Sequence, residues 1–275
     1  MSQQVHRIVL SNVGRTFTSA QGESIEALRG VNLEIEDRFS HDGKDIGEFH
    51  VLLGPSGCGK STVLRMVAGL DFPTTGEVTV NGAKVTGPGA GRGMVFQKYT
   101  SFEWLTVEQN IEYGMKLKGV AEAERRKICG HLLEATGLAS FAKAYPRTLS
   151  GGMQQRVAIA RTLAVRPQVV LMDEPFGALD AQTRNDMQSL LLKVWEESAS
   201  TIVFVTHDVA EAVYLADRIY IMSSRPGAIV DDMVVPFGRP RDPSIKTSNE
   251  FRDQEMEALT RLRRAAGGGN IRVSL

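Results

Sequence analysis

The feature that most constrains this chain is a glycine-rich segment at residues 54–61, with the sequence GPSGCGKS. It follows a short apolar run, Phe49 to Leu53, and precedes a stretch with helical spacing of apolar residues, Ser61 to Leu70. A strand, a glycine loop and a helix in this order form a phosphate-binding loop, in which backbone N–H groups and the helix N-terminus surround phosphate oxygens. The pattern predicts a nucleotide-binding α/β protein.

The residue types in this loop each have a chemical reason. We expect the Lys60 ammonium to bind the β- and γ-phosphates of ATP, and the Ser61 hydroxyl to bind Mg²⁺. Cys58 would contribute its backbone rather than its thiol. The alternative is a glycine turn that matches by chance. The predicted nucleotide-binding residues of the segment are Gly54, Pro55, Ser56, Gly57, Cys58, Gly59, Lys60, Ser61 and Thr62.

Two carboxylates end a second apolar run, in which Asp173 and Glu174 follow residues 169–172. A buried parallel strand delivers the residues at its carboxyl end to the ligand edge of an open sheet. We therefore expect Asp173 to help hold Mg²⁺ and Glu174 to act as the general base that polarises the attacking water. The alternatives are a helix N-cap and a solvated acidic turn.

Strands and helices alternate along the second half of the chain, which predicts a parallel sheet with helices on both faces. The middle section, from about residue 98 to 165, differs because it reads as amphipathic helices. The expected strands are 5–13, 31–35, 49–53, 169–172, 201–206 and 219–222, and the expected helices are 61–70, 107–118, 122–136, 184–197 and 209–216.

The composition excludes several classes of protein. Lys+Arg and Asp+Glu are equal at 32 each in 275 residues, so no net charge attracts nucleic acid or an acidic membrane surface. No apolar run approaches the roughly 20 residues that span a bilayer, and we see no secretory signal at the N-terminus. The two cysteines, Cys58 and Cys129, form neither a disulfide framework nor a metal cluster, which favours a reducing, cytoplasmic compartment.

One segment narrows the class further: residues 149–156, with the sequence LSGGMQQR, lie just before a predicted helix. The segment resembles the signature sequence of the ABC ATPase family, with Met153 where that sequence usually has glutamine. The resemblance implies that Ser150, Gly151 and Gly152 bind the γ-phosphate of ATP held by the opposite subunit of a dimer. A plain serine N-cap followed by glycines is the alternative.

Other motifs of the family occur in the expected order. By this resemblance, Gln97 contacts Mg²⁺ and the attacking water, Asp180 lies in a loop that crosses the dimer interface, and His207 binds the γ-phosphate. Phe17 falls where an aromatic ring stacks on adenine, although an isolated aromatic residue could equally belong to the core. A lone histidine at the end of a strand could also be structural.

The resemblance implies a P-loop NTPase (RecA-like) α/β core with an antiparallel β subdomain and an inserted helical subdomain. We expect residues 1–240 to form the nucleotide-binding domain, with the helical subdomain at about 98–160. Residues 241–275 would be a short C-terminal extension with a frayed tail, too short for the regulatory domain of sugar importers. Residues 37–46 look inserted relative to the family, and a longer solvated hairpin with a turn at Asp42–Gly43 is the expected structure.

Three segments resemble the importers that serve nitrate, sulfonates and taurine: residues 102–107 (FEWLTV), 175–184 (PFGALDAQTR) and 225–230 (RPGAIV). Glu103 replaces the usual proline before Trp104. Trp104 would help form a groove for a short helix of the membrane subunit, or could be an ordinary core aromatic.

The implied partners are a second ATPase subunit (an identical copy or a paralogue), integral membrane permease subunits, and a periplasmic or extracellular solute-binding protein. The implied cofactors are ATP and Mg²⁺, and the implied location is the cytoplasmic face of the inner membrane, through the permease. Three alternatives remain open: an ABC exporter ATPase, a soluble ABC protein that does not serve transport, and a nucleotide kinase or other phosphoryl transferase.

Overall fold

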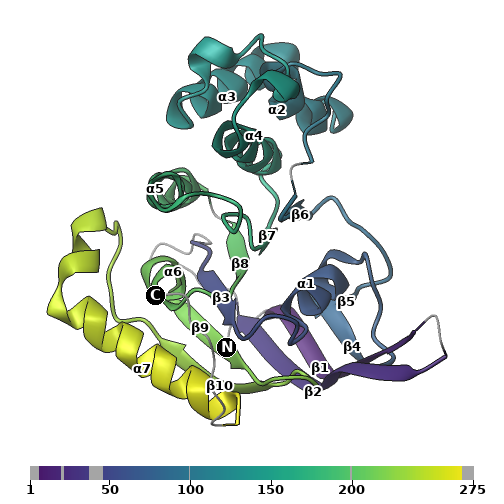
Figure 1. The fold of residues 1–275 in the computed structure, drawn as a ribbon. Helices are drawn as coiled ribbons and strands as arrows, with labels where there is room; N and C mark the ends of the chain where they lie inside the picture. Colours follow the sequence, from purple (N-terminus) through teal and green to yellow (C-terminus); the bar gives the residue numbers. More distant parts are fainter. Residues whose placement is uncertain (1–5, 20–21, 37–45, 99, 199, 268–275) are drawn as a thin grey trace, which may run out of the picture. The chain divides into compact units, whose positions relative to one another are not determined.

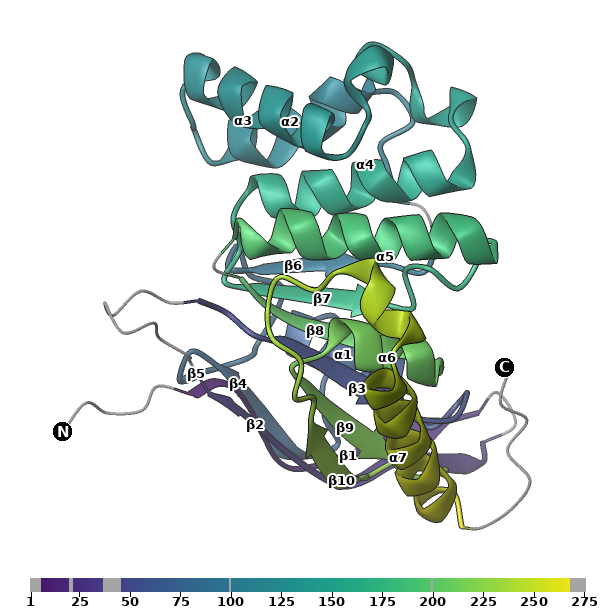
Figure 2. The ribbon, with the colours of Figure 1, turned by 90° about the vertical axis from the view of Figure 1, so that its left-hand side faces the viewer.

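The computed structural model describes residues 6–19, 22–36, 46–98, 100–198 and 200–267 (Figures 1 and 2). The chain divides into two compact units. The first unit comprises Met1–Gly89 and Thr201–Leu275, and the second unit comprises Ala90–Ser200. The turn predicted at Asp42–Gly43 and the last part of the tail predicted to fray, residues 268–275, lie outside the described residues.

An antiparallel sheet forms one layer of the first unit. Its strand order is β2-β1-β4-β5, and these strands span Ser24–Glu36, His6–Thr18, Thr75–Val80 and Ala83–Lys84. Along β2, Val31, Leu33 and Ile35 are buried and the residues between them are exposed, as expected for a strand with one face on a core. The predicted antiparallel β subdomain is therefore confirmed.

The second sheet of the first unit carries the phosphate-loop segment. The strands β3 (Phe49–Leu53), β8 (Thr201–Thr206) and β9 (Arg218–Met222) are parallel, and β10 (Ile229–Val234) pairs antiparallel with β9. Every residue of β3 and β8 is buried, which matches their continuous apolar sequences. Helix α1 (Lys60–Ala68) lies on one side of this sheet and α6 (Val209–Leu215) lies on the other (Figure 1).

A C-terminal helix, α7 (Asn249–Ala265), completes the first unit after a 3₁₀ turn at Pro243–Thr247. It buries a narrow stripe formed by Phe251, Ala258 and Leu262, and it packs against α6, β9 and β10 (Figure 2). Sequence patterns predicted only a short extension in this region, and none of them indicated this helix.

The second unit consists of four main helices over a short parallel pair of strands, β6 (Arg92–Val95) and β7 (Val169–Asp173). Each helix except α3 begins at a side-chain cap, and the cap residues are Thr106, Ser150 and Asp180. The helices are α2 (Val107–Leu117), α3 (Glu122–Ala135), α4 (Gly151–Ala164) and α5 (Ala181–Glu196), with 3₁₀ turns at Ala139–Phe141 and Pro146–Thr148.

The helices predicted at 107–118 and 122–136 are confirmed to within a residue. Among the described residues, no helix combines the length and the apolar character that crossing a membrane would require.

Candidate functional site

The glycine loop lies between β3 and α1, and its backbone has a conformation that requires glycine. Gly57 and Gly59 have positive φ angles of 77° and 105°. A Cβ atom on Gly59 would lie 2.4 Å from Leu28 Cδ2, and one on Gly54 would lie 2.8 Å from Cys58 Sγ. The loop therefore keeps its backbone close to its neighbours, in the kind of glycine conformation that lets successive N–H groups turn toward an anion.

Lys60 begins α1, and only 4% of its surface is exposed. Its ammonium donates hydrogen bonds to the carbonyls of Gly54 (2.8 Å) and Pro55 (3.1 Å). The side chain thus folds back across the loop, and its charge lies within the loop itself. The half-buried Ser61 and Thr62 follow in the first turn of α1.

A contact that the sequence did not predict supports the loop from the β9–β10 connection. A Cβ on Gly227 would lie 1.9 Å from the Cys58 carbonyl oxygen, and Arg225 Nη2 donates to the Gly57 carbonyl at 3.2 Å. In the sequence, the segment 225–230 is notable only for its resemblance to importers of nitrate, sulfonates and taurine. Its contact with the loop gives it a structural role that no local pattern reveals.

His207 and the glycine loop lie at the same edge of the sheet. In the parallel β3–β8 pair, Leu53 is in register with Thr206, so the next residues of each strand, Gly54 and His207, leave the sheet side by side. His207 is exposed, and the following residue, Asp208, caps α6 by accepting from Glu211 N at 2.9 Å. The structure therefore brings together the predicted phosphate loop and the predicted γ-phosphate ligand.

Phe17 lies near the end of β1, and 37% of its surface is exposed, so it does not belong to the core. The Arg15 guanidinium carbon lies 4.5 Å from the ring centroid, and Arg15 also forms an ion pair with Asp71 at 2.7 Å. The exposure leaves ring surface available for a planar ligand.

The acidic strand end and Gln97 meet in the second unit. Because β6 and β7 are parallel with Val95 opposite Met172, Gln97 and Glu174 both emerge at the carboxyl edge of the pair. A Cβ on Gly177 would lie 3.4 Å from the Glu174 carbonyl oxygen and 3.7 Å from Gln97 Nε2. Asp173 and Glu174 are half-buried, and Glu174 has a positive φ of 42°, a conformation that residues other than glycine rarely adopt.

The signature segment begins α4. Ser150 is its N-cap, and its hydroxyl accepts from Met153 N at 3.4 Å, which confirms an N-cap without excluding an anion ligand. Gly151 and Gly152 form the first turn, where backbone N–H groups have no partner within the helix. Gly152 is buried, and a Cβ there would lie 2.8 Å from Thr183 Cγ2 on α5. Its lack of a side chain thus also permits the close packing of α4 on α5.

Asp180 caps α5 through Thr183. Its carboxylate accepts from Thr183 N at 3.0 Å and from Thr183 Oγ1 at 2.7 Å. These two hydrogen bonds, the backbone one first, hold the pKa of Asp180 below its usual value. Thr183 therefore contacts both the Asp180 cap and the signature helix α4. Sequence patterns could not predict this link, because Thr183 is far from Gly152 in the sequence.

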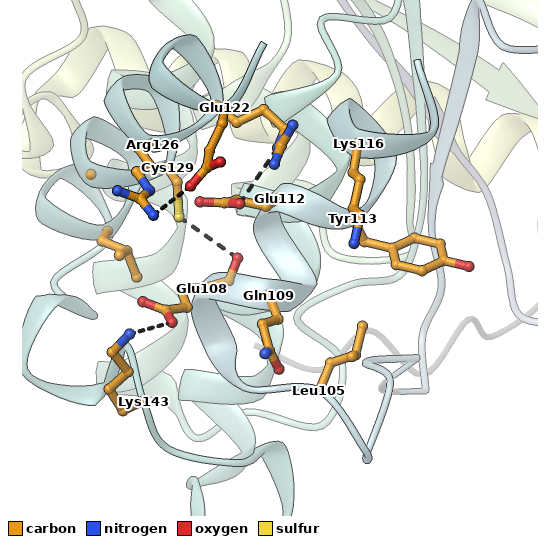
Figure 3. Close-up of a pocket in the computed structure, with 13 residues that line it drawn as sticks. Leu105, Glu108, Gln109, Glu112, Tyr113, Lys116, Glu122, Arg126, Cys129 and Lys143 are labelled. Atoms are coloured by element: carbon orange, nitrogen blue, oxygen red, sulfur yellow. Dashed lines mark hydrogen bonds and ion pairs between the residues drawn. The ribbon is translucent and has the colours of Figure 1, made fainter. Parts of the chain in front are cut away.

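Trp104 is 72% exposed, which excludes the alternative of a core aromatic. Its ring lies 5.3 Å from that of Phe102, which in turn lies 4.7 Å from Tyr113. Figure 3 shows residues that line a cavity between α2 and α3, among them Leu105, the residue that follows Trp104 in the sequence. The cavity has a volume of about 750 Å³. Ion pairs line it, including Glu108 with Lys143 at 2.6 Å and Glu112 with Arg125 at 3.6 Å.

The predicted residues thus form two groups, one in each unit. The phosphate loop, Phe17 and His207 belong to the first unit, and Gln97, Ser150 to Gly152, Asp173, Glu174 and Asp180 belong to the second. In the part of the chain that the structure describes, no three His, Cys, Asp or Glu side chains gather as a metal site. The one carboxylate among the predicted Mg²⁺ ligands, Asp173, is of the type that Mg²⁺ binds together with nucleotide phosphates and water.

A glycine loop between a buried strand and a helix, with an acidic strand end and a helix N-terminus rich in glycine, defines a P-loop nucleotide-binding protein. The ABC transporter family model matches residues 45–177. An uncharacterised ABC transporter ATP-binding protein of Methanocaldococcus jannaschii is 48% identical over 94% of this chain and 91% of its own length. The chain belongs to the ABC transporter ATP-binding family.

Two further relatives carry more specific names. The nitrate import ATP-binding protein of Synechocystis is 48% identical over 90% of this chain and 89% of its own length. The taurine import ATP-binding protein of Roseobacter denitrificans is 46% identical over 83% of this chain and 82% of its own.

Two solved structures of one bacterial ABC transporter cassette also match. Its dimeric form has a TM-score of 0.71, with 36% identity over 84% of this chain and 100% of the cassette. Its dimeric post-hydrolysis state, bound to ADP and phosphate, has a TM-score of 0.69 and 35% identity over the same shares. The fold is therefore the P-loop NTPase fold of ABC cassettes, and the protein is an ABC ATPase that binds and hydrolyses ATP.

Proposed function

We propose that this chain is the ATP-hydrolysing subunit of an ABC importer for a small anionic solute of the nitrate, sulfonate or taurine type. The observation that carries the proposal is the similarity to nitrate and taurine import ATP-binding proteins, which extends over more than four-fifths of each chain. The exposed Trp104, adjacent in sequence to Leu105 in the lining of the α2–α3 cavity, supports it, because an importer ATPase needs a surface that receives a helix of its membrane subunit.

In the proposed mechanism, two copies of this chain, or one copy and a paralogue, face each other. Each ATP lies between the phosphate loop of one subunit and Ser150 to Gly152 of the other. Phe17 stacks on the adenine, Lys60 binds the β- and γ-phosphates, and the loop N–H groups bind their oxygens. Asp180 lies at the interface between the subunits. The solved dimeric cassette at 36% identity supports this assembly.

The proposed hydrolytic residues lie at the strand edges. Ser61, Asp173 and Gln97 would hold Mg²⁺, which neutralises phosphate charge when bound. Glu174 takes a proton from the attacking water, and His207 donates a hydrogen bond to the γ-phosphate as charge builds on it. ATP closes the dimer because its γ-phosphate makes contacts that ADP lacks, so hydrolysis reopens it.

The importer proposal also assigns partners and a place in the cell. The Gln97 and Trp104 region of each subunit would bind a short helix of a permease, and a solute-binding protein outside the membrane would deliver the anion. The chain itself would lie on the cytoplasmic face of the inner membrane, held there by the permease.

Uptake by cells tests this function directly. Cells that lack this chain should lose energy-dependent uptake of labelled nitrate or taurine, and the wild-type gene should restore it. Glu174→Gln, expressed to the same level, should not restore uptake, whereas Glu197→Gln, which removes an exposed carboxylate on the same unit, should. Unchanged uptake of both anions in the deleted cells would contradict the proposed solute class.

A further inference from the structure

Helix α4 is tied at its far end to the segment that follows Gln97, and Arg161 makes the connection. Arg161 Nη1 donates to the Thr100 carbonyl at 2.7 Å, and Nη2 donates to Thr100 Oγ1 at 3.0 Å. The guanidinium carbon also lies 5.0 Å from the centre of the Phe102 ring, which is within cation–π range. The Arg161 side chain of α4 therefore contacts both Thr100 and Phe102, two residues of the same short loop.

This aromatic loop, residues 100–105, is also fixed from α2. Asn110 is fully buried, and its amide accepts from Phe102 N at 2.8 Å and donates to the carbonyls of Phe102 and Leu105, both at 3.1 Å. The Phe102 ring also contacts two other aromatic rings in tilted arrangements, that of Trp104 at 5.3 Å and that of Tyr113 at 4.7 Å between centroids. A satisfied hydrogen-bond network of this kind makes a loop rigid, so we expect a displacement of Phe102 to displace Trp104 as well.

The C-terminal half of α4 and its C-cap pack closely against β6 and α2. A Cβ on Gly93 of β6 would lie 2.5 Å from Thr162 Cγ2, and a Cβ on Gly114 of α2 would lie 2.5 Å from Val165 Cγ1. Strand β6, which precedes Gln97, and helix α2, which follows the aromatic loop, therefore both pack closely against α4. A closely packed interface of this kind does not deform continuously, so a shift of α4 shifts the loop.

The two ends of α4 make different contacts, the N-terminal end at Ser150 and the C-terminal end through Arg161. Ser150 caps the N-terminus, and Arg161 lies about 16 Å further along, at about 1.5 Å per residue. We propose that Arg161 is a positioning residue that makes α4 a rigid connection between the ATP contact at Ser150 and the aromatic loop that carries Trp104. The inference rests on the proposed nucleotide contact of Ser150, and it adds a second route to Trp104 besides the chain from Gln97.

The two tryptophans of the chain allow a direct test in the isolated protein. Trp195 is buried, so a Trp195→Phe background leaves the exposed Trp104 as the sole tryptophan. In this parent, ATP should change the emission of Trp104. Arg161→Met should weaken the coupling between ATP binding and the Trp104 environment by about 2- to 30-fold, the range for residues along a coupling network. The change in emission should fall accordingly, while labelled ATP still binds. Arg161→Lys should retain part of it, because an ammonium can still donate to the Thr100 carbonyl.

Arg156→Met is the matched control. Arg156 lies on the same helix and also donates to a carbonyl, that of Thr136 at 3.0 Å, but this bond leads to the end of α3 rather than to the aromatic loop. It should leave the Trp104 response unchanged. Thermal unfolding of each variant separates lost coupling from lost fold, and Arg161→Lys serves if Arg161→Met does not fold.

Three outcomes would overturn the inference. They are a full response in Arg161→Met, an equal loss in Arg156→Met, and a parent that binds ATP without any change in Trp104 emission. No permease or transported anion enters this experiment, so its result is independent of the uptake test of the proposed function.

Discussion

Replacing Glu174 with glutamine is expected to lower ATP turnover by about 10²- to 10⁴-fold, the usual contribution of a general base. The substitution keeps the size of the side chain and its place beside Gln97 at the end of β7, and it removes only the ability to accept a proton. ATP should still bind and should hold two copies together, because the γ-phosphate contacts persist. Turnover of labelled ATP and the mass of the ATP-bound species in solution measure both effects.

Glu197→Gln provides the control for charge and expression. Glu197 is exposed on the same unit and pairs with His131, so its loss should leave turnover unchanged. Near-normal hydrolysis by Glu174→Gln would remove Glu174 from the role of base. Lost hydrolysis without an ATP-bound dimer would contradict the proposed sharing of ATP between subunits.

Lys60→Met is expected to weaken ATP binding by about 10- to 150-fold, which corresponds to the loss of one charge-assisted hydrogen bond. Methionine is unbranched and of similar length, so it can occupy the same path across the loop, but it cannot donate to phosphate oxygens. It also loses the bonds to the Gly54 and Pro55 carbonyls, and for this reason the melting temperature is measured together with the affinity.

The matched control for Lys60 is Lys84→Met, an exposed lysine on β5 of the same unit. Equilibrium binding of labelled ATP should be unchanged in this variant. If Lys60→Met remained folded and bound ATP as tightly as the wild type, the ammonium would not be a phosphate ligand, and the assignment of the loop would need revision.

The sequence predicted the parts of the fold whose signals are local. The glycine loop, the buried strands such as β8 and the amphipathic helices α2 and α3 all have a pattern within a few residues, and the structure confirms each. Helix α7 was missed because it buries only a narrow stripe, with Phe251, Ala258 and Leu262 widely spaced. Strand β10 was missed because two consecutive aspartates, Asp231 and Asp232, interrupt its apolar pattern.

Contacts between residues far apart in the sequence could not be predicted from local patterns, because they depend on how the elements pack. The buried position of Gly152 depends on Thr183 in the next helix, and the position of the aromatic loop depends on Arg161, far along the chain. Trp104 could not be assigned to core or surface, because an aromatic residue suits either and only the fold decides its exposure. Local patterns therefore predicted which residues form the candidate site, and the fold supplied the side chains that support them.

Affinity capture of the tagged chain from native membranes, followed by mass spectrometry and an ATPase assay of the captured material, tests whether the chain is the ATPase subunit of an importer. We predict that a polytopic permease and a solute-binding protein accompany an active ATPase, and that Trp104→Ala releases the permease while Phe72→Ala, at another exposed aromatic residue, retains it. Capture of soluble partners alone, with no permease in the membrane fraction, would contradict the proposal that this chain serves a membrane importer.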